Sequence, residues 1–138
     1  MKFIPYLHFN GNCEEAFNAY AKILSGQPPM FFRFGDSPMA ASVGPDWAQK
    51  IMHVTLIAAG QTLNGCDAPS PHFEQPQGFR VCLDLDDEAE AERVFTPLSE
   101  GGKVSMALQE TFWAKRFAMF SDRFGTPWMI NVSKPMPM

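Results

Sequence analysis

The sequence predicts an α+β fold in which two βαβββ modules form a single domain of 138 residues. In each half of the chain a capped amphipathic helix follows one apolar strand pattern and precedes three more. When the chain is compared with itself at an offset of 75 residues, the helix cap, the apolar stripe and the terminating glycine coincide. The coinciding pairs are Asn12 with Asp87, Glu15 with Glu90, Ala16 with Ala91, Tyr20 with Phe95, Ile23 with Leu98, and Gly26 with Gly101.

The first module spans about residues 1–67. Its expected elements are a strand at 3–9, a helix from Asn12 to Gly26, and strands at Met30–Phe34, Ile51–Ala59 and Gln61–Cys66, the last two forming a hairpin around Gly60. Asn12, with Glu15 three positions later, has the pattern of a capping box. Residues 37–50 form a loop that is long for a compact domain and contains Trp47, so we regard this loop as a candidate lid.

Residues 68–78 contain three prolines and predict a connector between the modules. The second module, about 79–134, repeats the pattern. Its expected elements are a strand at Phe79–Leu85, a helix from Asp87 to Gly101, a strand at Lys103–Leu108, and an aromatic hairpin within Gln109–Asn131 that turns at Asp122–Gly125. Asp87 and Glu90 repeat the capping box, and Pro97 predicts that this helix ends early or bends.

Composition limits the partners. The chain is 46% hydrophobic and 19% charged with a net charge of −4, so we expect a globular protein that does not bind nucleic acid. The three cysteines form no CxxC pair, and we interpret them as reduced thiols of a cytoplasmic protein. We expect no membrane insertion, because no stretch approaches about 18 consecutive apolar residues.

Several stretches carry a family resemblance. PYLHFNGNCEEA, MHVTL with GCD, and QETFW with DRFGTPWMINV resemble the PhnB-like proteins of the vicinal oxygen chelate superfamily, which includes glyoxalases, bleomycin resistance proteins and dioxygenases. The resemblance covers nearly the whole chain, and the last motif is its most specific part. It implies paired modules with curved mixed sheets, a cavity inside each sheet, and commonly a homodimer. Because the superfamily contains both metal-dependent enzymes and metal-free drug-binding proteins, the fold alone does not choose the function.

Metal chemistry depends on the residues at the ligand positions of that superfamily. The resemblance places these positions at Pro5, Arg80, and near Asn64 and Met129, whereas superfamily enzymes carry His and Glu there. Proline cannot ligate, methionine is a poor ligand for hard divalent ions, and a cationic arginine repels them. We therefore expect the usual metal site to be absent.

A displaced metal site is an alternative. His8, His53, Cys66 and Asp67 could all lie at the edge of one curved sheet and offer suitable donor types. Histidines in strands are, however, more often hydrogen-bonded core or pocket residues than metal ligands. The expectation is a protein without a catalytic metal or other cofactor.

His53 is the best candidate for a catalytic residue. Strand alternation places His53 and Thr55 on the face opposite Val54, so His53 is either a structural histidine or a pocket acid or base. The resemblance favours the pocket. His8 and Asp67 are further candidates for ligand binding in this module.

Three residues of the second module are also candidates for ligand binding. Arg80 is the sole charge in its strand core and would suit a carboxylate or phosphate, although a salt bridge with Asp84 or Glu110 would explain it equally. Trp113 and Trp128 could stack on a planar ligand, and Trp128 is the more typical core residue.

Other chemistries lack their motifs. The sequence has no GxSxG elbow, no phosphate loop, and no glycine-rich strand-to-helix turn of the kind that binds adenosylmethionine, which argues against a methyltransferase. The leading hypothesis is a metal-free, homodimeric protein that binds a small organic molecule. The alternative is a lyase or isomerase that acts next to a carbonyl with a His base or a displaced divalent metal.

Overall fold

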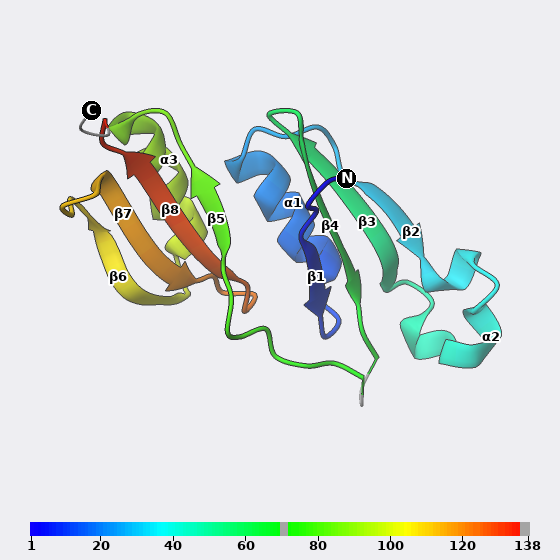
Figure 1. Ribbon diagram of the computed structural model, residues 1–138. Helices are drawn as coiled ribbons and strands as arrows, with labels where there is room; N and C mark the ends of the chain where they lie inside the picture. Colours follow the sequence, from blue (N-terminus) through cyan, green and yellow to red (C-terminus); the bar gives the residue numbers. More distant parts are fainter. Residues whose placement is uncertain (70–71, 136–138) are drawn as a thin grey trace. The chain divides into compact units, whose positions relative to one another are not determined.

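The computed structural model describes residues 1–69 and 72–135 of the chain. The chain divides into two compact units, Met1–Gln75 and Pro76–Met138, and the division falls inside the stretch expected to be a connector, 68–78. Each unit runs strand, helix and three strands, and each forms one four-stranded sheet with its long helix against one face (Figure 1). The predicted α+β fold of two βαβββ modules is confirmed.

Unit 1 has the strand order β1-β4-β3-β2, with β1 parallel to β4 and the other neighbours antiparallel. Its elements are β1 (Tyr6–Phe9), α1 (Cys13–Ile23), β2 (Met30–Arg33), α2 (Ala40–Val43), β3 (Ile51–Ala58) and β4 (Gln61–Asp67). The β3–β4 hairpin turns at Ala59 and Gly60, which both have positive φ, as a type I′ turn requires.

The core of unit 1 lies between α1 and one face of the sheet. The apolar stripe of α1 is fully buried, and Phe17 packs edge-to-face on Phe9 of β1, with ring centroids 6.0 Å apart. Gly65 of β4 allows this close approach, because a Cβ there would lie 2.6 Å from the Phe17 ring. Leu7 and Val54 point to the same side of the sheet and are also buried.

The N-terminus of α1 is not capped as the sequence predicts. The Asn12 side chain makes no capping hydrogen bond. Asp67, at the end of β4, instead accepts hydrogen bonds at Oδ1 from the backbone N–H groups of Gly11 (2.9 Å) and Cys13 (3.0 Å). The tertiary fold thus supplies a carboxylate acceptor for backbone N–H groups on either side of Asn12, at the start of α1.

The expected long loop at 37–50 contains short structure of its own. It includes α2 and a 3₁₀ turn, Pro45–Trp47, and the Trp47 ring packs edge-to-face on the buried Phe34 at 6.1 Å. Its interpretation as a lid stays a prediction.

Unit 2 has the strand order β5-β8-β7-β6, with β5 parallel to β8 and the other neighbours antiparallel. Its elements are β5 (Val81–Asp84), α3 (Glu88–Ser99), β6 (Lys103–Gln109), β7 (Ala114–Ser121) and β8 (Pro127–Ser133). Ala91, Val94 and Leu98 form the buried stripe of α3.

Asp87 caps α3 as predicted, since its Oδ1 accepts a hydrogen bond from the Glu90 N–H at 2.7 Å. The helix does not end early at Pro97, so that part of the prediction is wrong. It continues to Ser99 because Pro97 lies in the last turn, where proline removes only one helical hydrogen bond, and because Leu98 anchors that turn in the core.

The final hairpin turns at Asp122–Gly125 as predicted. Asp122 Oδ1 accepts from the N–H groups of Phe124 and Thr126, at 2.9 and 3.0 Å. Its Oδ2 accepts from the indole Nε1 of the fully buried Trp128 at 2.7 Å, which ties the turn to the core of the unit.

Among the described residues, no helix combines the length and the apolar character that crossing a membrane requires.

Candidate ligand-binding site

One face of the unit 1 sheet carries polar and aromatic side chains, while α1 packs on the opposite face. Register pairs Tyr6 with Asn64 and His8 with Cys66 across β1 and β4, while Thr55 of β3 stands opposite Asn64. These positions alternate with the buried residues that face α1, so they share the other side of the sheet. We call this side the helix-free face of unit 1.

A hydrogen-bonded chain runs along this face from β1 to β3. The Tyr6 hydroxyl lies 2.9 Å from Nδ1 of His53, and Nε2 of His53 lies 3.2 Å from the Thr55 hydroxyl. A neutral histidine donates from one nitrogen and accepts at the other, so the two hydroxyls take opposite roles. His53 is therefore held in a defined orientation between two groups that can both donate and accept.

Burial raises the pKa of the Tyr6 hydroxyl to about 12, with smaller contributions from Cys66 and Cys13. Tyr6 therefore keeps its proton at neutral pH. The chain links two hydroxyls through the imidazole of His53, so a proton can pass along its hydrogen bonds.

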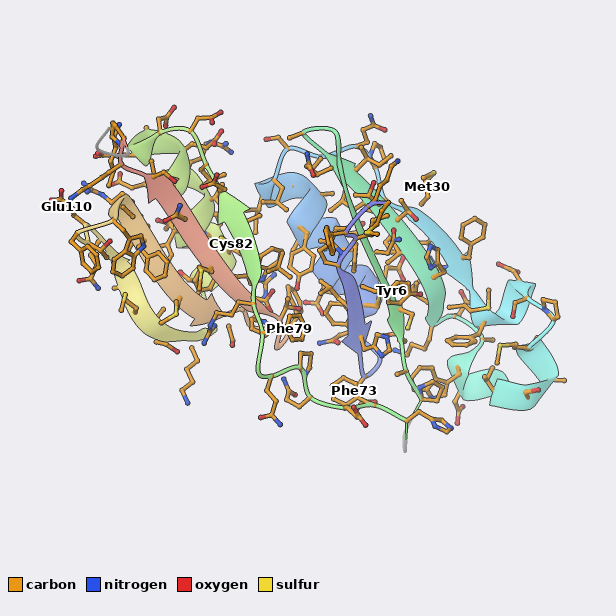
Figure 2. The ribbon with its side chains drawn as sticks, in the orientation of Figure 1. Tyr6, Met30, Phe73, Phe79, Cys82 and Glu110 are labelled. Atoms are coloured by element: carbon orange, nitrogen blue, oxygen red, sulfur yellow. The ribbon has the colours of Figure 1, made fainter. Side chains whose placement is uncertain are left out.

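Exposed rings surround this chain. Figure 2 marks Tyr6 and Met30 in unit 1, and both remain substantially exposed, as does Phe32 at 58%. The His53 ring lies 5.5 Å from the Tyr6 ring and 6.4 Å from the Phe32 ring, and His8 contacts Tyr6 edge-to-face at 5.5 Å. His8 and His53, both predicted from the sequence, are thus brought to one surface, with Tyr6 between them.

Asn64 adds an unsatisfied acceptor to this face. Its Oδ1 is buried and has no hydrogen-bond partner in the part of the chain that the structure describes. A buried acceptor without a donor costs about 1–3 kcal/mol, so a donor that reached it would be favourable.

The thiols are poorly suited to nucleophilic attack. Burial raises the pKa of Cys13 and of Cys66, and Asp67 raises both further. The pKa of Cys82 is also raised, mainly by burial and to a smaller extent by the negative charge of Asp84. Hydrogen bonding to Tyr6 opposes the shift at Cys66 without reversing it.

Asp67 does not take the ligand-binding position expected from the sequence. It is 1% exposed, and in addition to capping α1 its Oδ2 accepts from the Ile51 N–H at 2.9 Å. Both carboxylate oxygens accept hydrogen bonds from the backbone, so Asp67 is not part of the candidate site.

Residues 1–69 and 72–135 contain no group of three or more His, Cys, Asp or Glu side chains that could hold a metal ion. The displaced set of His8, His53, Cys66 and Asp67 is therefore not assembled as a metal site, and Asp67 lies on the helix side of the sheet.

In unit 2 the side of the sheet away from α3 has a different chemistry. A row of sulfur-containing residues crosses all four strands: Cys82 pairs with Met129, Met129 with Met119, and Met119 with Met106. Methionine side chains are flexible and polarisable, so this surface can adapt to apolar ligands. Figure 2 marks Cys82 on β5 and Phe79 just before it.

A depression of about 440 Å³ lies at one end of this sheet. Arg80 lines it, and its Nη1 donates to the backbone carbonyls of Phe120 (2.9 Å) and Trp128 (3.4 Å). The salt bridges that the sequence allowed with Asp84 or Glu110 are not formed. Glu110 pairs instead with Lys134 at 2.9 Å, and Asp84 accepts from the amide of Asn131.

The two candidate tryptophans, Trp113 and Trp128, differ in their exposure to solvent. Trp128 is fully buried, so it packs in the core and does not offer the ligand contact named as a candidate. Trp113 is 44% exposed just before β7 and clusters with Phe112 and Phe117, with ring centroids 4.8 and 5.2 Å away. It remains available for stacking, but on a different unit from His53.

Sequence reasoning missed Tyr6 and Phe32 as members of the site, and it named Asn64 only as lying near a ligand position of the superfamily. The signal for Tyr6 was available, because strand alternation puts it on the same face as His8 two positions later. Phe32 and Asn64 depend on the pairing of β2 and β4 with β3, which a single strand pattern does not reveal.

Comparison with known proteins gives a consistent result. A family model described as 3-demethylubiquinone-9 3-methyltransferase matches residues 1–131. The Escherichia coli (strain K12) protein YjdN is 37% identical, with 99% of each chain covered. The crystal structure of PA1353 from Pseudomonas aeruginosa has a TM-score of 0.85 at 43% identity, covering 98% of this chain and 99% of that one.

More distant structures are similar in fold alone. The PhnB protein from Bacillus cereus has a TM-score of 0.72 at 21% identity, covering 96% of this chain and 100% of that one. A glyoxylase/bleomycin resistance protein/dioxygenase domain from Frankia sp. EAN1pec has a TM-score of 0.67 at 10% identity, covering 99% and 93%.

Proposed function

This chain belongs to the PhnB-like family described as 3-demethylubiquinone-9 3-methyltransferase, which has the glyoxalase/bleomycin resistance fold, and we propose that it binds a small organic molecule without a catalytic metal. The proposed site is the helix-free face of unit 1. The observation that carries the proposal is the Tyr6–His53–Thr55 hydrogen-bonded chain surrounded by exposed aromatic rings.

This combination suits a planar molecule with a polar edge. Tyr6 and Phe32 supply exposed ring surface at low conformational cost, and the oriented hydroxyls and imidazole supply donors and acceptors. The unsatisfied Asn64 Oδ1 favours a ligand that also carries a donor.

The residues at the superfamily's ligand positions support a metal-free site. Asn64 and Met129 are weak ligands, Pro5 has no donor, and Arg80 carries a positive charge that repels a cation. Elemental analysis of protein purified without a metal-affinity tag should find transition metal well below one atom per chain. A stoichiometric metal would require a different site.

A fragment titration monitored at the histidine rings tests the binding proposal. Full-length protein with ¹³C-labelled histidine would be titrated with planar heteroaromatic fragments that carry amide or hydroxyl groups. Binding fragments should shift the ring signal of His53 and leave that of His72 in place. Tyr6→Phe, which removes the hydroxyl and keeps the ring, should weaken binding by about tenfold. Fragments that bind the protein without moving the His53 signal would refute the assignment.

A lyase or isomerase acting next to a carbonyl is the second candidate. One observation favours it: His53 is hydrogen-bonded to a tyrosine that retains its proton, so Tyr6 could donate to a carbonyl oxygen while His53 moves a proton. Incubation of small ketones and 2-hydroxy ketones with the protein in D₂O, followed by NMR, would detect exchange of the hydrogens next to the carbonyl. Exchange that disappears in His53→Ala while fragment binding persists would select the enzyme. Absence of exchange with fragment binding intact would select the binding protein.

The strand-to-helix turns of this chain do not support the methyl transfer that the family's description names. Adenosylmethionine-binding folds use the free N–H groups of a glycine-rich turn between a strand and a helix. In this protein, Asp67 accepts from the N–H groups of Gly11 and Cys13 where β1 leads into α1, and the side chain of Asp87 caps α3.

A further inference from the structure

We propose that the Arg80 depression of unit 2 is a second binding site, which takes the carboxylate group of a small molecule with an apolar body. The inference goes beyond the proposed function, because it uses only residues of unit 2 and requires nothing of Tyr6 or His53.

Arg80 is held in place by the backbone. Its Nη1 donates to the carbonyl oxygens of Phe120 and Trp128 on the neighbouring strands β7 and β8. Carbonyl groups orient a guanidinium but do not neutralise its charge. The side chain is therefore pre-organised, and a ligand would not have to fix a mobile arginine.

Among residues 1–69 and 72–135, the charge of Arg80 has no carboxylate partner. The ion pairs among the described residues join Arg33 to Glu14, Arg93 to Glu90, Arg116 to Glu88, and Lys134 to Glu110. Arg80 is absent from these pairs although it is partly buried. A half-buried cation without a counter-ion favours an anion from outside the chain.

The geometry of the guanidinium selects a carboxylate. Because Nη1 is engaged, the edge formed by Nε and Nη2 remains, and neither atom has a partner among residues 1–69 and 72–135. This edge presents two parallel N–H groups that match the two oxygens of a carboxylate. The lining contains no second cation, so a monoanion suits it better than a phosphate dianion.

The rest of the lining is mainly apolar. Phe79, which is 54% exposed, lines the depression together with Pro76, Pro127 and Met129. Ser121 and Gln77 add one hydroxyl and one amide. An aromatic or branched body attached to the carboxylate could therefore pack on Phe79 and Met129 while its charge meets Arg80.

Benzoate is the probe for this site. The full chain, with ¹⁵N-labelled arginine, would be titrated with benzoate, with the neutral benzamide of the same shape, and with phenyl phosphate. Benzoate should shift the Nε–H signal of Arg80 saturably with a Kd of about 1 mM, ordinary for so small a ligand. Benzamide should bind at least about tenfold more weakly.

Three variants distinguish the loss of the Arg80 charge from a loss of folding. Arg80→Gln should weaken benzoate binding by about ten- to a hundredfold, whereas Arg93→Gln, an exposed arginine on α3, should leave it unchanged. Ser121→Asp keeps Arg80 and supplies a carboxylate within the depression. It should abolish benzoate binding while leaving the melting temperature unchanged or raised, so the test holds even if Arg80→Gln folds poorly.

The proposal fails if benzoate produces no saturable shift at about 10 mM, tenfold above the expected Kd. It also fails if benzamide binds as well as benzoate, or if Ser121→Asp binds benzoate normally. Tighter binding of phenyl phosphate than of benzoate would overturn the choice of a carboxylate.

Discussion

The hydroxyl of Tyr6 lies between the imidazole of His53 and the thiol of Cys66 on β4. Partial burial leaves it less hydrated than the hydroxyl of a fully exposed tyrosine. Removing water disfavours the charged phenolate, which is why the pKa rises. The neutral hydroxyl can then act as a donor at physiological pH.

This environment predicts the ionisation of Tyr6. The chain has two tyrosines, so the ultraviolet pH titration of the wild type minus that of Tyr6→Phe isolates Tyr6. The difference should titrate near pH 12, not near the usual 10. Because the folded state holds this proton more tightly than the unfolded chain, the stabilisation is complete below pH 10 and is lost between about pH 10 and 12. A transition at pH 10 would contradict the burial of the hydroxyl.

Ser25 has an unfavourable backbone conformation that a substitution should relieve. It follows α1 with φ of 55°, in the left-handed region that glycine adopts without steric cost. Ser25→Gly should raise the free energy of unfolding by about 0.5–1 kcal/mol. Urea unfolding would measure it as a higher midpoint with an unchanged m-value. Ser99→Gly, at a helical position in α3, is the control and should lower stability instead.

At the scale of elements, the two helices occupy equivalent places but are capped differently. Asp87 caps α3 locally from the position before the helix, as its sequence pattern predicts. Asp67 caps α1 from the end of β4 and also holds the first residue of β3, so one carboxylate joins three elements. A buried charge satisfied by three donors contributes more to stability than an exposed cap does.

A comparison of the two aspartates tests this difference. Asp67→Ala should lower the free energy of unfolding by about 3 kcal/mol or more, because it leaves buried N–H groups without an acceptor. Asp87→Ala should cost about 1 kcal/mol, the usual value of an N-cap. Both would be measured by urea unfolding of the full chain. Equal losses would show that Asp67 acts only as a cap.

At the scale of the whole molecule, two units with the same order of elements carry different chemistry on their helix-free faces. Unit 1 presents a hydrogen-bonded chain of hydroxyls and imidazole, whereas unit 2 presents a row of sulfur-containing residues beside a pre-organised arginine. The repeat thus preserves the buried pattern that makes each unit fold, and the residues on the opposite face are free to differ.

We propose that the chain forms a homodimer, and large exposed apolar side chains support this. Phe3 and Phe112 are almost fully accessible in the single chain, and pairing would remove such surface from water. Light scattering coupled to size-exclusion chromatography should give twice the mass of the 15.4 kDa chain over a wide range of concentrations. A single-chain mass at every concentration would rule the homodimer out.

The sequence by itself determined the βαβββ repeat, the Asp87 cap, the turn at Asp122 and the two faces of each strand. Each of these depends on residues close together in the chain, where periodicity and turn chemistry operate directly. The same alternation predicts that His8 and His53 each point away from the buried residues of their own strand.

Only the tertiary structure decided what those faces contain. Asp67 became a cap for α1, and Arg80 has no carboxylate partner in the part of the chain that the structure describes. The Tyr6 hydroxyl is hydrogen-bonded to His53 across the intervening strand β4. These outcomes depend on which strands become neighbours and in what register, and pairings between residues about fifty positions apart leave no local signal in the sequence.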